Sequence, residues 1–213
     1  MKADKQSMLL YAVTDRAWLG IHTLEEQVEE VLKAGATFLQ LREKDMSYEA
    51  FLREAKEIKK LADRYQVPFV IDDNIQIALE CGADGIHVGQ SDRSAAEVRS
   101  LIGKDKILGV SAQTVEQAVQ AEQNGADYLG VGAVFSTSTK LDANSVSFDT
   151  LQKICKSVSI PVVAIGGISE QNILQLKGSG VDGVAVISAI FAKSDVYAAT
   201  KTLRSLSEQM VQP

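Results

Sequence analysis

Two aspartates stand where they could share a metal ion. Asp73 follows the apolar segment 69–71, and Asp92 follows the apolar segment 85–89. Mg²⁺ in enzymes takes one or two protein carboxylates, while substrate phosphates and water complete its octahedral shell. The alternative is structural, since each aspartate also precedes a helical segment that it could cap. Zinc is not indicated, because His22 and His87 belong to no Cys/His cluster and an apolar segment surrounds His87.

Basic residues stand near these acids in the predicted arrangement. Arg42 and Lys44 alternate with Leu41 and Glu43 at the end of the apolar segment 38–41. Lys140 ends a loop in which residues 136–139 all carry hydroxyl groups. A loop lysine is ordinarily solvated, but the hydroxyl residues before it add donors for phosphate oxygens. Cations beside a candidate metal site predict a polyanionic ligand such as a diphosphate.

The last part of the chain offers a second anion site. Gly166 and Gly167 follow the apolar segment 162–165, and Ser188 follows the segment 184–187. Backbone N–H groups of a Gly-Gly turn can approach a phosphate closely, although such a pair is often only a turn. The position of these residues supports the predicted anion site, because the loops after the last two strands of a (β/α)₈ barrel commonly bind phosphate.

A repeated phrase predicts the architecture that would hold these residues. Ala-Gly-Ala-Thr at 34–37 recurs in related form at 81–84, 124–127 and 179–182, each time closing a helical stretch and opening an apolar run. The glycine suits the left-handed residue that ends a helix, and the apolar runs suit strands buried on both faces. Four such junctions, with room for another strand and helix between them, predict a (β/α)₈ TIM barrel.

The expected elements fill residues 1–213 as a single domain. We expect strands at 9–13, 38–41, 69–71, 85–89, 107–110, 128–134, 162–165 and 184–187. We expect helices at 23–34, 47–65, 75–81, 95–102, 115–123, 148–157 and 170–177, a short helical turn at 189–191 and a terminal helix from 196. In such a barrel the loops after the strands converge on one rim. The polar residues described above therefore predict an active site on that rim.

Composition narrows the class of protein. The chain of 213 residues is 46% hydrophobic and has a net charge of −6, so it offers no basic surface for nucleic acid. No apolar segment approaches the ~20 residues that cross a bilayer, and the brief apolar run at 8–13 lacks a signal-peptide cleavage site. We expect a cytoplasmic protein. Cys81 and Cys155 lack the spacing of a metal or redox motif and are expected to be free, buried thiols.

Several motifs together resemble one family. Gln-Leu-Arg-Glu-Lys at 40–44, the run at 82–92 ending in Gly-Gln-Ser-Asp, Thr-Ser-Thr-Lys at 137–140, Ala-Ile-Gly-Gly-Ile at 164–168 and Val-Ile-Ser-Ala-Ile at 186–190 are similar, in order, to thiamine-phosphate synthase. The resemblance covers nearly the whole chain. It implies a transferase that joins 4-amino-2-methyl-5-(diphosphooxymethyl)pyrimidine to a thiazole ethyl phosphate with Mg²⁺. Diphosphate would leave first, and the thiazole nitrogen would capture the pyrimidine cation.

The resemblance also implies roles for particular residues. It places the pyrimidine diphosphate on Gln40, Arg42, Lys44, Asp72, Ser111 and Lys140, with Mg²⁺ on Asp73 and Asp92. It places the thiazole phosphate on the loop Thr137, Ser138 and Thr139 and on Gly167, Ile187 and Ser188. Arg42, Lys44, Ser111 and Lys140 form the expected catalytic set. One departure is Asp72, since the family usually has Asn there.

Two other functions stay open at this point. A thiazole tautomerase of the same superfamily would keep the phosphate site without the diphosphate and metal residues. The presence of Arg42, Lys44, Asp73 and Asp92 opposes it, as does Gln113 near the position where such relatives have a catalytic His. A non-catalytic phosphate-binding regulator is the second alternative. The sequence leaves open the oligomeric state, including a homo-oligomer, and the choice between carboxylated and decarboxylated thiazole.

Overall fold

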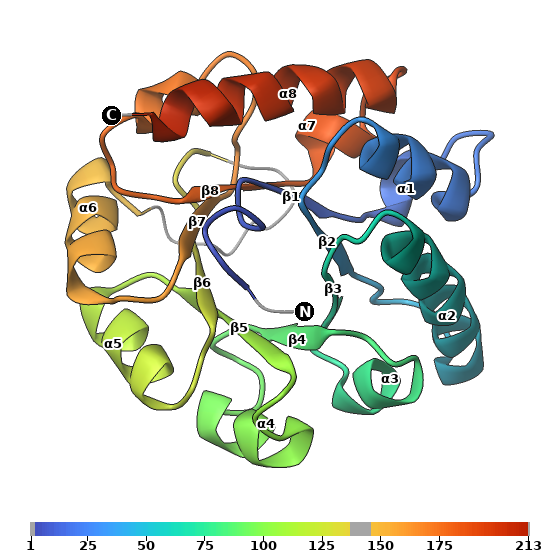
Figure 1. The fold of residues 1–213 in the computed structure, drawn as a ribbon, viewed down its shortest axis with the longest axis horizontal. Coiled ribbons are helices and arrows are strands. Elements are labelled where there is room, and N and C mark those ends of the chain that lie inside the picture. Colours follow the sequence, from blue (N-terminus) through green and yellow to red (C-terminus); the bar gives the residue numbers. More distant parts are fainter. Residues whose placement is uncertain (1–2, 137–145, 213) are drawn as a thin grey trace.

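The chain forms a closed barrel of eight parallel strands in the order β1-β2-β3-β4-β5-β6-β7-β8 (Figure 1). The computed structural model describes residues 3–136 and 146–212. The strands are β1 (Leu10–Val13), β2 (Phe38–Leu41), β3 (Phe69–Asp72), β4 (Gly85–Val88), β5 (Ile107–Ala112), β6 (Tyr128–Val131), β7 (Val162–Ile165) and β8 (Gly183–Val186). Pairing of β8 with β1 closes the barrel, so no strand edge is left open. The predicted TIM barrel is confirmed.

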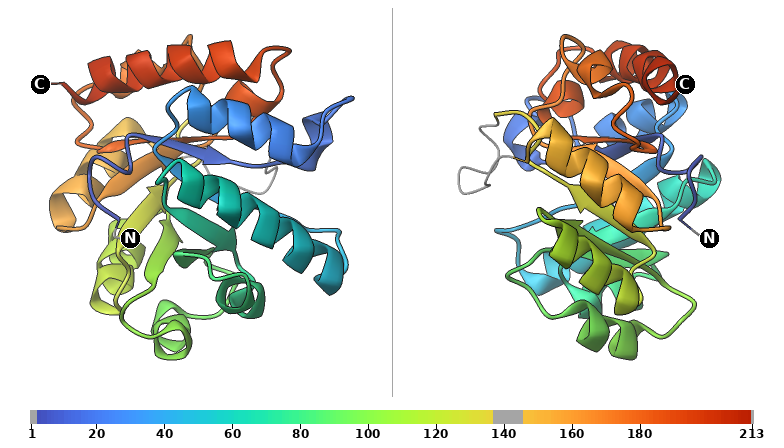
Figure 2. Two further views of the ribbon diagram at one scale, coloured as in Figure 1. Left: turned by 45° about the vertical axis from the view of Figure 1, so that its right-hand side comes forward. Right: turned by 90° about the vertical axis from the view of Figure 1, so that its left-hand side faces the viewer.

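Helices surround the barrel (Figure 2). They are η1 (Arg16–Trp18), α1 (Leu24–Lys33), α2 (Tyr48–Arg64), α3 (Ile75–Glu80), α4 (Ala95–Ile102), α5 (Val115–Gln123), α6 (Phe148–Ser157), η2 (Ile173–Leu176), α7 (Ser188–Phe191) and α8 (Val196–Val211). Thr23 and Glu26 form the predicted capping box of α1, and Ser47 caps α2. The long α8 lies beside α1, so the last helix packs next to the first (Figure 1). Within the described part of the chain, no helix is both long and apolar enough to cross a membrane.

The repeated glycines adopt the conformation that the sequence predicts. Gly35, Gly82, Gly125 and Gly180 have φ angles of 101°, 72°, 88° and 92°. A side chain would strain this left-handed region, whereas glycine enters it freely. Gly35, Gly82 and Gly125 therefore end α1, α3 and α5. Gly180 lies beyond the end of η2 and turns the chain into β8 in the same way.

Two predicted elements differ most in extent from the structure. No α-helix covers 170–177; only η2 forms there, because Asn172 accepts a hydrogen bond from the Ser169 backbone and donates one to the carbonyl of Gly167. These local side-chain bonds compete with regular helix formation. The sixth strand also ends at Val131 rather than 134, and the backbone of residues 134–135 bonds to residues 165–166 at the end of β7.

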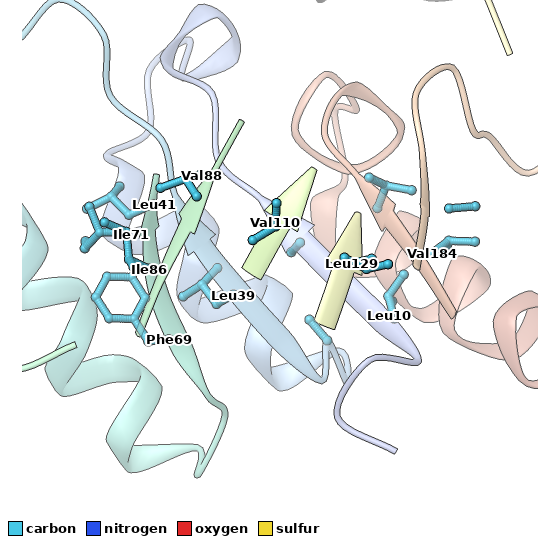
Figure 3. Packing of buried hydrophobic residues seen from close by; sticks show 14 of the residues in the cluster. Leu10, Leu39, Leu41, Phe69, Ile71, Ile86, Val88, Val110, Leu129 and Val184 are labelled. Carbon is cyan, nitrogen blue, oxygen red and sulfur yellow. The ribbon is translucent and has the colours of Figure 1, made fainter. Parts of the chain in front are cut away.

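The core has two layers. Strand side chains including Leu39, Phe69 and Ile86 pack outward against the helices, as Figure 3 shows. Alternate residues including Tyr11 and Tyr128 fill the barrel interior. Met8, which is fully buried, precedes β1 and packs into the same interior cluster. The filled interior leaves room for ligands only toward the carboxyl ends of the strands.

Candidate active site

A cavity of about 520 Å³ opens at the carboxyl ends of the strands. Every strand contributes at least one side chain or glycine to its wall. Each predicted site residue in the described part of the chain lines it, namely Gln40, Arg42, Lys44, Asp72, Asp73, Asp92, Ser111, Gly167, Ile187 and Ser188. The remaining predicted residues, Thr137, Ser138, Thr139 and Lys140, lie outside the described residues. The barrel thus gathers residues from distant loops into one site.

One wall of the cavity holds cations and carboxylates in contact. Lys44 Nζ lies 2.9 Å from Asp72 Oδ2 and also donates to Asp73 Oδ2. Arg42 Nε lies 3.7 Å from Asp72 Oδ2, and Arg42 Nη1 lies 3.9 Å from Asp15 Oδ2. Partial burial disfavours the charged ammonium of Lys44, but the hydrogen bonds that it donates to Asp73 and Asp72 outweigh this effect and raise the pKa of Lys44. Lys44 therefore stays a cation at neutral pH.

Glu43 lies on the opposite side of the segment from Arg42 and Lys44. Its buried carboxylate Oε1 is 2.8 Å from Arg16 Nε, and Arg16 also donates to Glu54 of α2. Burial, followed by the neighbouring Glu54, raises the pKa of Glu43 to about 7, against the opposing effect of Arg16. Two buried glutamates thus share one arginine directly behind the cationic wall. This cluster ties the segment after β2 to η1 and α2.

Glu43→Gln is expected to change how stability depends on pH. The folded protein holds the Glu43 proton more tightly than the unfolded chain, so its stabilising contribution is complete below about pH 4.5 and is lost as pH rises through 7. The glutamine of the variant does not titrate, so the variant does not lose stability in this way as pH rises. Relative to the parent, its free energy of unfolding should therefore rise by about 1–3 kcal/mol between pH 5 and pH 8. Urea unfolding at both pH values measures the difference.

The exposed Glu57→Gln is the matched control, because it removes a carboxylate from the same helix as Glu54 without disturbing the buried cluster. It should shift stability equally at both pH values. The same behaviour in Glu43→Gln would contradict a perturbed Glu43.

The alternative that Asp73 and Asp92 serve as helix caps is wrong. Asn74 caps α3 and Ser94 caps α4, so neither aspartate is needed as a cap. Asp73 instead pairs with Lys44 and has a φ of 55°, while Asp92 Oδ2 accepts a 2.7 Å hydrogen bond from the Gly89 backbone. Both carboxylates line the cavity. Because neither is spent on a helix end, both remain suited to a ligand or a metal ion.

The donor chemistry of this wall fits Mg²⁺ bound jointly with a phosphate ligand. The described residues contain no group of three or more His, Cys, Asp or Glu arranged to hold a metal ion by themselves. Mg²⁺ needs no such cage, since one or two carboxylates suffice when phosphate oxygens and water fill the other positions. Asp73 and Asp92 supply that number beside two cations that attract phosphate.

The opposite wall has the close backbone approach expected of an anion site. Gly166 and Gly167 follow β7 with φ angles of 97° and 66°. A Cβ on Gly167 would lie 2.3 Å from the Ser136 carbonyl oxygen and 2.8 Å from that of Phe135. Ile187 and Ser188, which follow β8, line the same cavity. Only glycine fits at 167, because any side chain would collide with the backbone of residues 135–136.

Sequence reasoning missed part of the cavity floor. His87 lines the cavity, with Nδ1 3.0 Å from Tyr128 Oη and Nε2 3.0 Å from Ser111 Oγ. His87 is buried, and it is also a polar link to Ser111, a predicted site residue. The sequence could have identified His87 as an inward-facing residue. Side chains alternate along a strand, which puts His87 on the same face as Gly85 and Gly89.

Known proteins with the same arrangement can now be compared. The sequence profile of the family described as "Thiamine monophosphate synthase" matches residues 10–190. Thiamine-phosphate synthase of Ruminiclostridium cellulolyticum is 54% identical over 94% of this chain and 95% of its own length. That of Clostridium beijerinckii is 51% identical over 92% and 94%.

Solved structures agree with the sequence relatives. Thiamine phosphate pyrophosphorylase from Pyrococcus furiosus superposes with a TM-score of 0.90, at 38% identity, over 98% of this chain and 99% of that one. The chain therefore belongs to the thiamine-phosphate synthase family, a family of transferases in thiamine biosynthesis.

Proposed function

We propose that the protein condenses 4-amino-2-methyl-5-(diphosphooxymethyl)pyrimidine with a thiazole ethyl phosphate, giving thiamine phosphate and diphosphate with Mg²⁺. The observation that carries this proposal is one cavity with two different walls, each of which has groups suited to an anion. Arg42 and Lys44 with Asp73 and Asp92 form one wall, and the glycine turn with Ser188 forms the other. Two substrates, one a diphosphate and one a monophosphate, would need such a pair.

The protein's own groups would act on charge and position. Bond cleavage at the pyrimidine methylene leaves negative charge on the departing diphosphate, and Arg42 and Lys44 lie where they can meet it. The raised pKa of Lys44 keeps that charge available. The glycine turn and Ser188 would hold the thiazole phosphate so that its ring nitrogen faces the methylene carbon. A dissociative reaction of this kind needs no side-chain nucleophile.

Asp73 and Asp92 would hold Mg²⁺. When bound, the ion would neutralise diphosphate oxygens and so improve the leaving group. A thiazole tautomerase is the weaker candidate, because its phosphate site has no use for the cation and carboxylate wall. The proposal places the reaction in the cytoplasm, supported by the free thiols of Cys81 and Cys155, which suit a reducing compartment.

One assay tests the proposal directly. Purified protein is incubated with both substrates and Mg²⁺, and released diphosphate and thiamine phosphate are measured. Product is expected only when both substrates and the metal are present. Binding of both ligands without diphosphate release would instead support a non-catalytic regulator, and turnover of the thiazole alone would support a tautomerase.

Asp72→Asn is expected to strengthen binding of the pyrimidine diphosphate. Asp72 Oδ2 pairs with Lys44 and lies near Arg42, so it competes with the ligand for both cations and repels its phosphates. Removing one negative charge should lower the KM for this substrate by about three- to tenfold. The KM for the thiazole phosphate should hardly change. A higher pyrimidine KM would mean that Asp72 matters more for orienting Lys44 than for competing with the ligand.

A further inference from the structure

A chain of polar side chains crosses the barrel interior beneath the cavity. Gln40 Nε2 lies 2.6 Å from Tyr11 Oη, and Tyr11 Oη lies 2.8 Å from Tyr128 Oη. Tyr128 Oη lies 3.0 Å from His87 Nδ1, and His87 Nε2 lies 3.0 Å from Ser111 Oγ. The chain begins and ends at residues that line the cavity, while both tyrosines are fully buried between them.

The sheet leaves space for this chain. A Cβ on Gly109 would lie 2.1 Å from Tyr128 Cζ, and one on Gly130 would lie 3.3 Å from His87 Cε1. Inward-facing glycines on β5 and β6 thus make room for two large polar rings in the interior. Close packing around the Tyr128 and His87 rings holds each ring in one orientation, and this orientation fixes the hydrogen-bond partners of its polar atoms.

The direction of the hydrogen bonds follows from counting protons. The Gln40 amide donates to Tyr11. Burial raises the pKa of both tyrosines above the usual value, so each keeps one proton to give. In the assignment that gives every hydroxyl proton an acceptor, Tyr11, which accepts from Gln40, donates to Tyr128, and Tyr128 donates to His87 Nδ1. In this assignment His87 Nδ1 accepts, so the imidazole carries its proton on Nε2 and donates it to Ser111 Oγ.

This assignment leaves the Ser111 hydroxyl as a hydrogen-bond donor. Its oxygen accepts from His87, so its hydroxyl proton is available to a ligand in the cavity. We propose that Tyr128 is a positioning residue that, through the tautomer of His87, makes Ser111 a hydrogen-bond donor to the pyrimidine substrate. The proposal rests on the proposed function in placing that substrate against Ser111. It means that the site selects a ligand with an acceptor atom, such as a ring nitrogen, at this point.

The first test needs no substrate. Two-bond ¹⁵N–¹H correlation spectra of protein with ¹⁵N-labelled histidine report which ring nitrogen of His87 holds the proton. The parent protein should show it on Nε2. Tyr128→Phe should release this preference, whereas Tyr11→Phe should keep it, because Tyr128 still has its proton to donate. The two variants are matched, since each removes one buried hydroxyl from the same chain.

Two results would overturn the proposal: a parent protein with the proton on Nδ1, which reverses the whole chain, or an unchanged tautomer in folded Tyr128→Phe. The parent spectrum decides the first point even where the variant folds poorly. Kinetics add a second readout, since Tyr128→Phe should raise the KM for the pyrimidine diphosphate by about three- to tenfold and leave that for the thiazole phosphate near normal. Equal increases for both substrates would indicate a general structural role instead. Absence of turnover in the parent would contradict the proposed function while leaving the spectra able to decide the tautomer.

Discussion

Replacing Asp73 or Asp92 by Ala is expected to lower turnover at least ~100-fold, with part of the loss recovered at high Mg²⁺ concentration. Each substitution would remove one of two protein ligands from a shared ion, so the apparent Mg²⁺ affinity should fall in both variants. The measurement is diphosphate release as a function of Mg²⁺ at saturating substrates. Unchanged Mg²⁺ dependence in both variants would rule out the metal assignment.

The structure sharpens this experiment with matched variants. Asp92→Asn keeps an oxygen that can accept from the Gly89 backbone, so it separates loss of charge from loss of the local turn. Asp105→Ala removes an exposed aspartate on the loop before β5 and should leave turnover and Mg²⁺ dependence unchanged. Because Asn74 and Ser94 are the helix caps, neither active-site variant should lose the ~1 kcal/mol of stability that a cap contributes. A loss of that size would restore the capping explanation.

Gly167→Val is expected to raise the KM for the thiazole phosphate by ~10-fold or more, since one lost charged hydrogen bond is worth ~1.5–3 kcal/mol. The backbone at Gly167 is left-handed, and a Cβ there would lie 2.3 Å from the Ser136 carbonyl oxygen. Any side chain must therefore push the two loops apart on the wall that would hold the monophosphate. The KM for the pyrimidine diphosphate should stay near normal, because that ligand is placed on the other wall.

Gly178→Ala provides the control for backbone strain. Gly178 also has a left-handed φ, of 79°, but a Cβ there meets no heavy atom within 4 Å. It should cost some stability, as a side chain at such a φ does, and leave both KM values unchanged. Calorimetric titration of each ligand into the two variants separates the effects. Equal weakening of both ligands by Gly167→Val would contradict the division of the cavity into two sites.

The sequence alone determined where the strands lie and which loops share a rim. Glycines at 35, 82 and 125 end helices by a purely local conformational preference, Gly180 takes the same left-handed φ before β8, and the apolar runs after all four begin the strands. Helix caps such as Thr23 could also be predicted from the sequence, because a capping box spans only four residues. Once parallel strands are expected, their carboxyl ends must meet. The gathering of Arg42, Asp73, Asp92 and Ser188 at one rim followed from that rule.

Only the tertiary structure decided how the residues of the rim pair with one another. Asn74 rather than Asp73 caps α3, a difference of one position that composition cannot resolve and backbone geometry can. Likewise, the sequence pattern predicted a helix at 170–177, but hydrogen bonds made by the Asn172 side chain replace it.

Long-range partners depend on the closed barrel. Tyr11 and Tyr128 are 117 residues apart, yet their hydroxyl groups meet in the interior because β1 and β6 both point alternate side chains inward. Glu43 meets Glu54 and Arg16 only because α2 folds back over β2. Sequence periodicity tells which face a side chain takes, since that depends on neighbours along the chain. Which group it meets there depends on strand order and register, and closure of the barrel fixes both.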